Sequence, residues 1–120
     1  MPNLRQGQII WKEVPDSNGY NCYRRPVIIL NRTVEIAPAE KLTGVVVSVT
    51  AYDKNPRPAD YIEIPYHRQG RVRTKLKKPC VAVCSWLIEL DKQVPESDIC
   101  GIVPPQVMEE IINAVRSCHE

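Results

Sequence analysis

The stretch NGYNCYRRPVIIL, residues 18–30, decides the fold, because a polar, glycine-bearing loop runs directly into an apolar segment. Residues 27–30 are continuously apolar rather than alternating, which predicts a strand that is covered on both faces. Pro26 lacks the N–H that a ladder hydrogen bond needs, so it is expected at the first position of this strand. The loop therefore delivers Arg24 and Arg25 to the mouth of a buried strand, and the rigid step at Pro26 holds Arg25.

Length and composition predict one soluble domain over residues 1–120, with 43% hydrophobic and 25% charged residues. The chain has no Phe and 11 Pro, so Ile, Val and Leu must build the core while prolines separate many short elements. This favours a β-rich architecture. A net charge of +2 indicates no partner by itself. A membrane span is not expected, since no apolar run reaches the roughly 18 residues that one requires.

The five cysteines, at positions 22, 80, 84, 100 and 118, form no CxxC pair. Their odd number, and the lack of a signal peptide before them, favour a reduced, cytoplasmic protein. Cys80 and Cys84 are expected to share a strand face. Without a CxxC pair or a histidine cluster, they do not indicate a metal site.

Five segments have the apolar density or alternation of strands, namely residues 8–11, 25–30, 45–50, 61–65 and 80–90, the last being the final strand expected. Residues 14–19, 31–42 and 51–60 read as loops, and residues 94–102 as a linking segment. A helix is predicted to open at Pro104 and Pro105. Its apolar stripe consists of Val107, Met108, Ile111, Ile112 and Val115. Mainly β structure with one C-terminal helix predicts a small barrel.

Four cations alternate with less polar residues after the turn at residues 67–70. They are Arg71, Arg73, Lys75 and Lys77. This period of two predicts a basic strand over residues 71–77 that has all four cations on one face. Such a face fits the phosphates of a nucleic acid, and it fits a solvated surface equally well.

Five motifs follow one another along nearly the whole chain. They are Gly7-x-Ile9-x-Trp11, Arg25-Pro26 followed by the apolar run, Thr43-Gly44 before a strand that ends at Thr50, Leu90-Asp91-Lys92, and Gly101-x-Val103 before the last helix. This ordered set resembles the MazF/PemK (Kid) family of type II toxin endoribonucleases.

The resemblance implies an SH3-like barrel (MazF/PemK/CcdB-like) that forms a homodimer, has a small antitoxin as partner, and needs no metal or other cofactor. It implies cleavage of single-stranded RNA to a 2′,3′-cyclic phosphate and a 5′-hydroxyl. By the same resemblance, Arg25 matches the family's catalytic arginine and Thr50 its catalytic threonine.

The chemistry of these two side chains suits that reaction. Arg25 offers a planar, permanently charged fork for two phosphate oxygens, and Thr50 offers a hydroxyl hydrogen bond. The alternatives are a surface salt bridge for Arg25 and a threonine that caps a turn. His67 is a weak candidate for the general base, and an ordinary turn histidine is the competing interpretation.

Further RNA contacts are expected from the loop and from aromatic side chains that can stack on unpaired bases. These residues are Gly19, Tyr20, Asn21, Tyr23, Arg24 and Trp86. Packing in the core is the alternative for Trp86, which has apolar neighbours in sequence.

The chain departs from the family's pattern at three places. Tyr20-Asn21 replaces a Glu-Gln or similar pair, Ala51 replaces a serine, and Ser85-Trp86 replaces an acidic residue and Gln. A catalytically silent protein of the same fold, binding RNA or a protein partner, is therefore the competing hypothesis.

Overall fold

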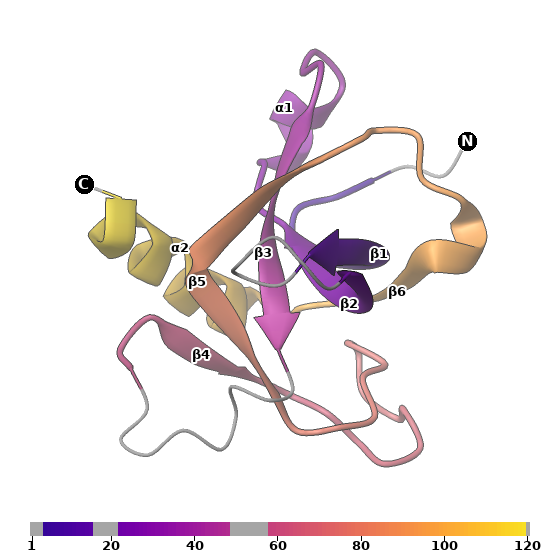
Figure 1. Cartoon of the computed structure of the whole chain (residues 1–120), viewed down its shortest axis with the longest axis vertical. Coiled ribbons are helices and arrows are strands. Elements are labelled where there is room, and N and C mark those ends of the chain that lie inside the picture. Colours follow the sequence, from indigo (N-terminus) through magenta and orange to yellow (C-terminus); the bar gives the residue numbers. More distant parts are fainter. Residues whose placement is uncertain (1–3, 16–21, 49–57, 120) are drawn as a thin grey trace.

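The computed structural model describes residues 4–15, 22–48 and 58–119. The elements follow in the order β1 (Gln8–Pro15), β2 (Cys22–Ile29), α1 (Thr33–Ile36), β3 (Leu42–Ser48), β4 (Tyr61–Ile64), β5 (Cys80–Leu90), the 3-10 turn η2 (Glu96–Asp98), β6 (Ile99–Ile102) and α2 (Pro105–His119). The strands form one antiparallel sheet in the order β4-β5-β3-β2-β1-β6, with α2 against it (Figure 1). This confirms the prediction of a mainly β fold with a C-terminal helix.

The apolar run of β2 is buried on both faces, as its continuous pattern predicts. Ile28 belongs to a core cluster that also holds Met108 and Ile111 of α2. Its neighbours Val27 and Ile29 belong to a second cluster. The sheet therefore separates two apolar layers, and α2 covers only one of them.

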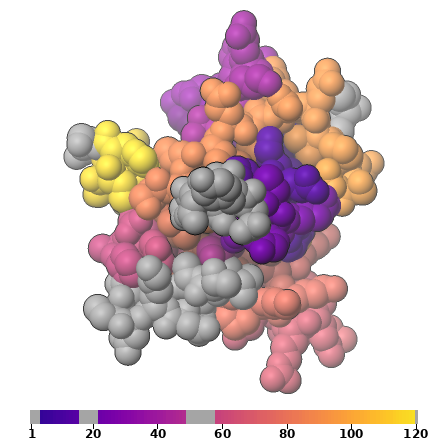
Figure 2. All heavy atoms as spheres, viewed as in Figure 1, coloured from indigo at the N-terminus to yellow at the C-terminus, as the bar shows by residue number. Residues whose placement is uncertain are grey.

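The predicted apolar stripe of α2 is confirmed. Met108 and Ile111 are buried, and Val107, Ile112 and Val115 pack against the first core cluster. The polar face of the helix, including Glu109 and Glu110, is exposed. In Figure 2 its last turns project from one side of the molecule.

The prediction that Pro26 begins its strand is wrong, because Pro26 is the fifth residue of β2. It pairs with Trp11 of β1, and the pairing of β2 with β3 starts only at Val27. Among the described residues, Pro26 thus has a paired residue on only one side of β2, and an unpaired side is the position at which a sheet accepts a missing N–H. The same pairing carries β1 to Pro15, beyond the predicted turn at Val14.

Three further predictions about local structure are wrong. The predicted loop at residues 31–42 contains the single helical turn α1, and Leu42 already begins β3. The predicted linking segment at residues 94–102 contains η2 and β6, so β5 is not the final strand. Residues 71–77 are not a strand in the structure. The predicted strand at residues 61–65 is present as β4.

Candidate nucleic-acid interface

Arg25 lies between two aromatic side chains. Its guanidinium carbon is 5.4 Å from the ring centroid of Tyr23 and 5.2 Å from that of Trp86. Both distances fall within the roughly 6 Å over which a cation is attracted to an aromatic face. The position of Tyr23 beside Arg25 is explained by strand alternation, because residues two apart on β2 share a face. Trp86 comes from β5, a strand that is not adjacent to β2 in the sheet.

A bulge in β5 brings Trp86 into this position. Val45 of β3 pairs with Leu87 and the next residue, Val46, pairs with Val83, so residues 84–86 have no paired residue on β3. Bulges bend a strand and re-aim side chains, and β5 bends sharply in Figure 1. Sequence alternation alone misses this contact, because the bulge interrupts the period of two.

No carboxylate of the described residues forms an ion pair with Arg25. Its Nε atom is buried and has no hydrogen-bond partner among the described residues. A buried donor without an acceptor costs about 1–3 kcal/mol, so such a group is expected to have a role that offsets this cost. An oxyanion could accept from such an arginine, because the fork of the guanidinium matches phosphate geometry.

Arg24 has the opposite environment. Its Nη2 donates to Oδ1 of Asp98, at the end of η2, over 2.6 Å. Arg24, rather than Arg25, therefore forms the surface salt bridge that the sequence analysis considered as the alternative role of Arg25. No sequence pattern pointed to Asp98, because 74 positions separate the two residues. Arg24 remains predicted as an RNA contact, but a carboxylate already takes part of its charge.

The four cations at Arg71, Arg73, Lys75 and Lys77 are all exposed, while Thr74 and Leu76 between them are buried. The alternation survives without a strand. A turn forms instead, in which Lys75 N donates to Val72 O over 3.0 Å and Lys75 has a φ of 59°. The cations consequently do not form the flat row predicted for a strand. Residues 66–78 gather at one corner of the molecule (Figure 2).

Residues 71–77, called the basic segment below, are fixed to the rest of the fold through their buried side. Thr74 Oγ1 donates to Pro65 O over 2.7 Å, and Ile102 N of β6 donates to Arg73 O over 2.9 Å. Cys100 Sγ donates to Thr74 O over 3.2 Å. Gly101 permits this approach, since a Cβ there would lie 2.2 Å from Arg73 O. The exposed cations are thus carried on an ordered backbone.

The remaining predicted site residues divide into two groups. Gly19, Tyr20, Asn21 and Thr50 lie outside the described residues. His67 lies in a shallow hollow of about 630 Å³ formed by its own turn, and its Nδ1 accepts from Gln69 N over 3.1 Å. This contact fits the ordinary turn histidine.

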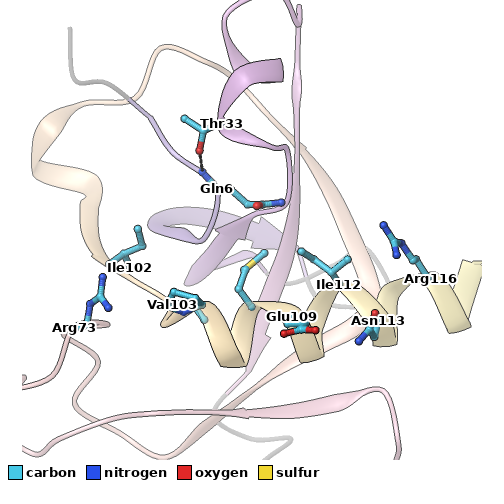
Figure 3. A pocket seen from close by; sticks show the side chains of 11 residues that line it. Gln6, Thr33, Arg73, Ile102, Val103, Glu109, Ile112, Asn113 and Arg116 are labelled. Carbon is cyan, nitrogen blue, oxygen red and sulfur yellow. Dashed lines mark hydrogen bonds between the residues drawn. The ribbon is translucent and has the colours of Figure 1, made fainter.

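A second hollow, of about 430 Å³, lies between α2 and the segments that precede β1 and follow β4. Figure 3 shows Glu109 and Arg116 of α2 on one side, with Gln6 and Arg73 on others. Arg25, Tyr23 and Trp86 do not line it. This hollow is therefore separate from the group formed by Arg25 and its two aromatic neighbours.

Cys80 and Cys84 share a face of β5, as predicted, and both are buried under α2. Burial raises the pKa of each thiol to about 12. Neither is a thiolate at neutral pH. Within residues 4–15, 22–48 and 58–119, no three His, Cys, Asp or Glu side chains are grouped to hold a metal ion. No helix in the described part of the chain is long and apolar enough to cross a membrane.

The chain matches no family model and no curated protein. Solved structures give a clear result. MazF from Deinococcus radiodurans superposes with a TM-score of 0.67 at 16% identity, over 98% of this chain and 96% of that chain. The Mycobacterium tuberculosis toxin MazF-mt6 gives a TM-score of 0.62 at 18% identity, over 92% and 94% of the two chains.

A mycobacterial endoribonuclease, solved in complex with its cognate antitoxin, gives a TM-score of 0.60 at 14% identity, over 98% of this chain and 94% of that chain. At these identities the likeness is one of fold. The chain has the fold of MazF toxins along almost its whole length.

Proposed function

We propose that this protein is the toxin of a type II toxin-antitoxin system and cleaves single-stranded RNA without a metal ion. The observation that carries the proposal is Arg25, a partly buried cation with no carboxylate partner among the described residues. It stands in an Arg-Pro step on a fold shared with MazF toxins.

The reaction uses the RNA's own 2′-hydroxyl as nucleophile. The 2′-oxygen bonds to the adjacent phosphorus and loses its proton, while the bond from phosphorus to the 5′-oxygen breaks and that oxygen gains a proton. The products are a 2′,3′-cyclic phosphate and a 5′-hydroxyl. Two negative charges develop on the phosphorane oxygens, and a fixed cation beside them lowers the barrier most. Arg25 would supply that charge, and Thr50 a hydroxyl hydrogen bond.

Two groups would bind the rest of the RNA. The exposed cations of the basic segment would contact phosphates, and Tyr23, which is 57% exposed, would stack on a base. Gly19, Tyr20 and Asn21 between β1 and β2, together with Arg24 of β2, would complete the contacts. A homodimer would frame the RNA groove with strand edges from both subunits, and an antitoxin would be the protein partner, as in the mycobacterial complex.

The deciding experiment incubates the purified protein with a long unstructured RNA in EDTA and maps the new ends. We expect discrete cuts that leave cyclic phosphates. A substrate with 2′-deoxyribose at the cut position should bind but stay intact, because it lacks the nucleophile. Cleavage of that substrate would contradict the mechanism. Tight RNA binding with no cleavage of any sequence would favour the catalytically silent alternative.

The proposed dimer has its own test. Sedimentation at micromolar concentration should report two chains per particle. A strictly monomeric protein that still cleaved RNA would exclude the dimer while leaving the chemistry intact.

A further inference from the structure

Trp86 is the aromatic side chain that the sequence assigns to base stacking or to the core, and the structure gives it a different neighbour. Its ring faces the guanidinium of Arg25 at 5.2 Å. The rest of the side chain packs against two apolar clusters, one of which contains Val81 and Val83 of its own strand. Trp86 is therefore fixed by packing and presents a ring to a cation.

An aromatic ring orients an arginine differently from a carboxylate. A carboxylate accepts the N–H groups and cancels the positive charge, so an incoming phosphate must compete with it. A ring attracts the cation through its quadrupole, and it accepts no hydrogen bonds from the N–H groups that lie in the plane of the guanidinium. The guanidinium keeps both its charge and its donors for a ligand.

The neighbouring arginine shows the contrast within one strand. Arg24 donates from its Nη2 to Oδ1 of Asp98 over 2.6 Å. Arg25 instead lies beside the rings of Tyr23 and Trp86, and its buried Nε has no partner in the part of the chain that the structure describes. Tyr23 is 57% exposed, so packing fixes it less than it fixes Trp86.

From these contacts we propose that Trp86, carried by the β5 bulge, is a positioning residue that holds Arg25 toward an RNA phosphate without neutralising it. The inference rests on the proposed function for its substrate. It assigns a role in holding the arginine to Trp86, which belongs to the Ser85-Trp86 pair that the sequence analysis singled out. Stacking on an RNA base then falls to Tyr23 rather than to Trp86.

The test compares Trp86→Leu, which keeps apolar bulk but removes the ring, with Trp86→Phe, which keeps a smaller ring. For Trp86→Leu we expect kcat to fall about 10-fold to 100-fold, the loss typical of a displaced catalytic group, with little change in KM. Trp86→Phe should recover most of this loss. Trp11→Phe is the matched control, since Trp11 of β1 packs against the first core cluster whereas Trp86 packs against two others, and its rates should equal those of wild type.

A second readout does not depend on activity. Protons above an aromatic face resonate upfield, so the Nε–H signal of Arg25 should be shifted upfield in wild type and should return toward the position of exposed arginines in Trp86→Leu. Arg25→Lys identifies the signal by removing it. If wild type cleaves no RNA, the proposed function fails, and this signal alone decides whether Trp86 positions Arg25.

Trp86→Glu tests the claim about charge, and Trp86→Met, which also fills the space with an apolar side chain that has no ring, serves if Trp86→Leu does not fold. The carboxylate should pair with Arg25, abolish cleavage and lower the log-log salt slope of RNA binding by about 0.7, the value for one lost single-strand phosphate contact. Folded Trp86→Leu with wild-type kcat, or an Arg25 signal that the ring's removal does not move, would overturn the inference.

Discussion

Arg24 and Asp98 join β2 to the end of η2 through a contact of 2.6 Å between Nη2 and Oδ1. Their side chains are 53% and 25% exposed, so water weakens the pair and its contribution to stability is at most about 1 kcal/mol. Its larger consequence is electrostatic, because the pair neutralises Arg24 and leaves only Arg25, of these two adjacent cations, to bind an anion.

Asp98→Asn should therefore strengthen RNA binding at low salt. The substitution removes the negative charge and frees Arg24 to contact a phosphate, which should steepen the log-log salt dependence by about 0.7. Binding curves on a short RNA between low and moderate salt measure this slope. In the Arg24→Ala background the same substitution should have no such effect, and an equal effect there would show that Arg24 is not the cation released.

The basic segment predicts a graded loss of salt dependence. Each alanine substitution among Arg71, Arg73, Lys75 and Lys77 that removes a phosphate contact should lower the slope by about 0.7. Lys41 is the matched control, because it is also exposed but already paired with Asp91. An unchanged slope in the quadruple variant would mean that this segment is simply a solvated surface.

Gly101 should tolerate no side chain. A Cβ there would lie 2.4 Å from Thr74 O as well as 2.2 Å from Arg73 O, both backbone atoms that cannot move without displacing the basic segment. Gly101→Ala should lower the free energy of unfolding by about 1–3 kcal/mol, as overpacking does elsewhere. Urea denaturation measures the loss. A wild-type midpoint for this variant would contradict the close approach of β6 to residues 73–74.

The buried thiols predict an alkaline loss of stability. Burial raises the pKa of Cys80 and of Cys84 from 9.0 to about 12, so the native state keeps protons that the unfolded chain releases. The stabilisation is complete below pH 9 and is lost as the pH rises from 9 toward 12. Each thiol contributes a fall of about 1.4 kcal/mol per pH unit in this window. Urea unfolding at several pH values should show a flatter alkaline decline for Cys80→Ala/Cys84→Ala than for wild type.

Sequence patterns predicted the parts of the fold that depend on continuous apolar runs. The run at Val27 and the stripe around Ile111 predicted β2 and α2, because burial on two faces or on one helical face leaves a period in the sequence. β6 was missed because it has four residues, including Gly101, and too few apolar side chains to show a period.

The basic segment shows the limit of alternation. Thr74 and Leu76 are buried between exposed cations, so the in-and-out pattern was correct. The inference of a strand was wrong, because alternation does not reveal whether a neighbouring strand is available for hydrogen bonds. Likewise Arg25 and Tyr23 could be placed together from strand geometry, whereas Trp86 could not, because a bulge has no period.

The catalytic prediction concerns Arg25 and Thr50 together. Removing a group that stabilises transition-state charge commonly lowers the rate by about two to three powers of ten, so Arg25→Ala and Thr50→Ala should each lose that much. Arg25→Lys should not restore the rate, because an ammonium cannot offer two parallel N–H groups to two phosphate oxygens. Rates should be compared on folded protein in EDTA. Arg32→Ala is the control, because Arg32 is an exposed arginine whose Nη1 lies 3.7 Å from Oε1 of Glu35. Full activity in Arg25→Ala or in Thr50→Ala would exclude that residue from catalysis, and an active Arg25→Lys would mean that charge alone, without the fork, is sufficient.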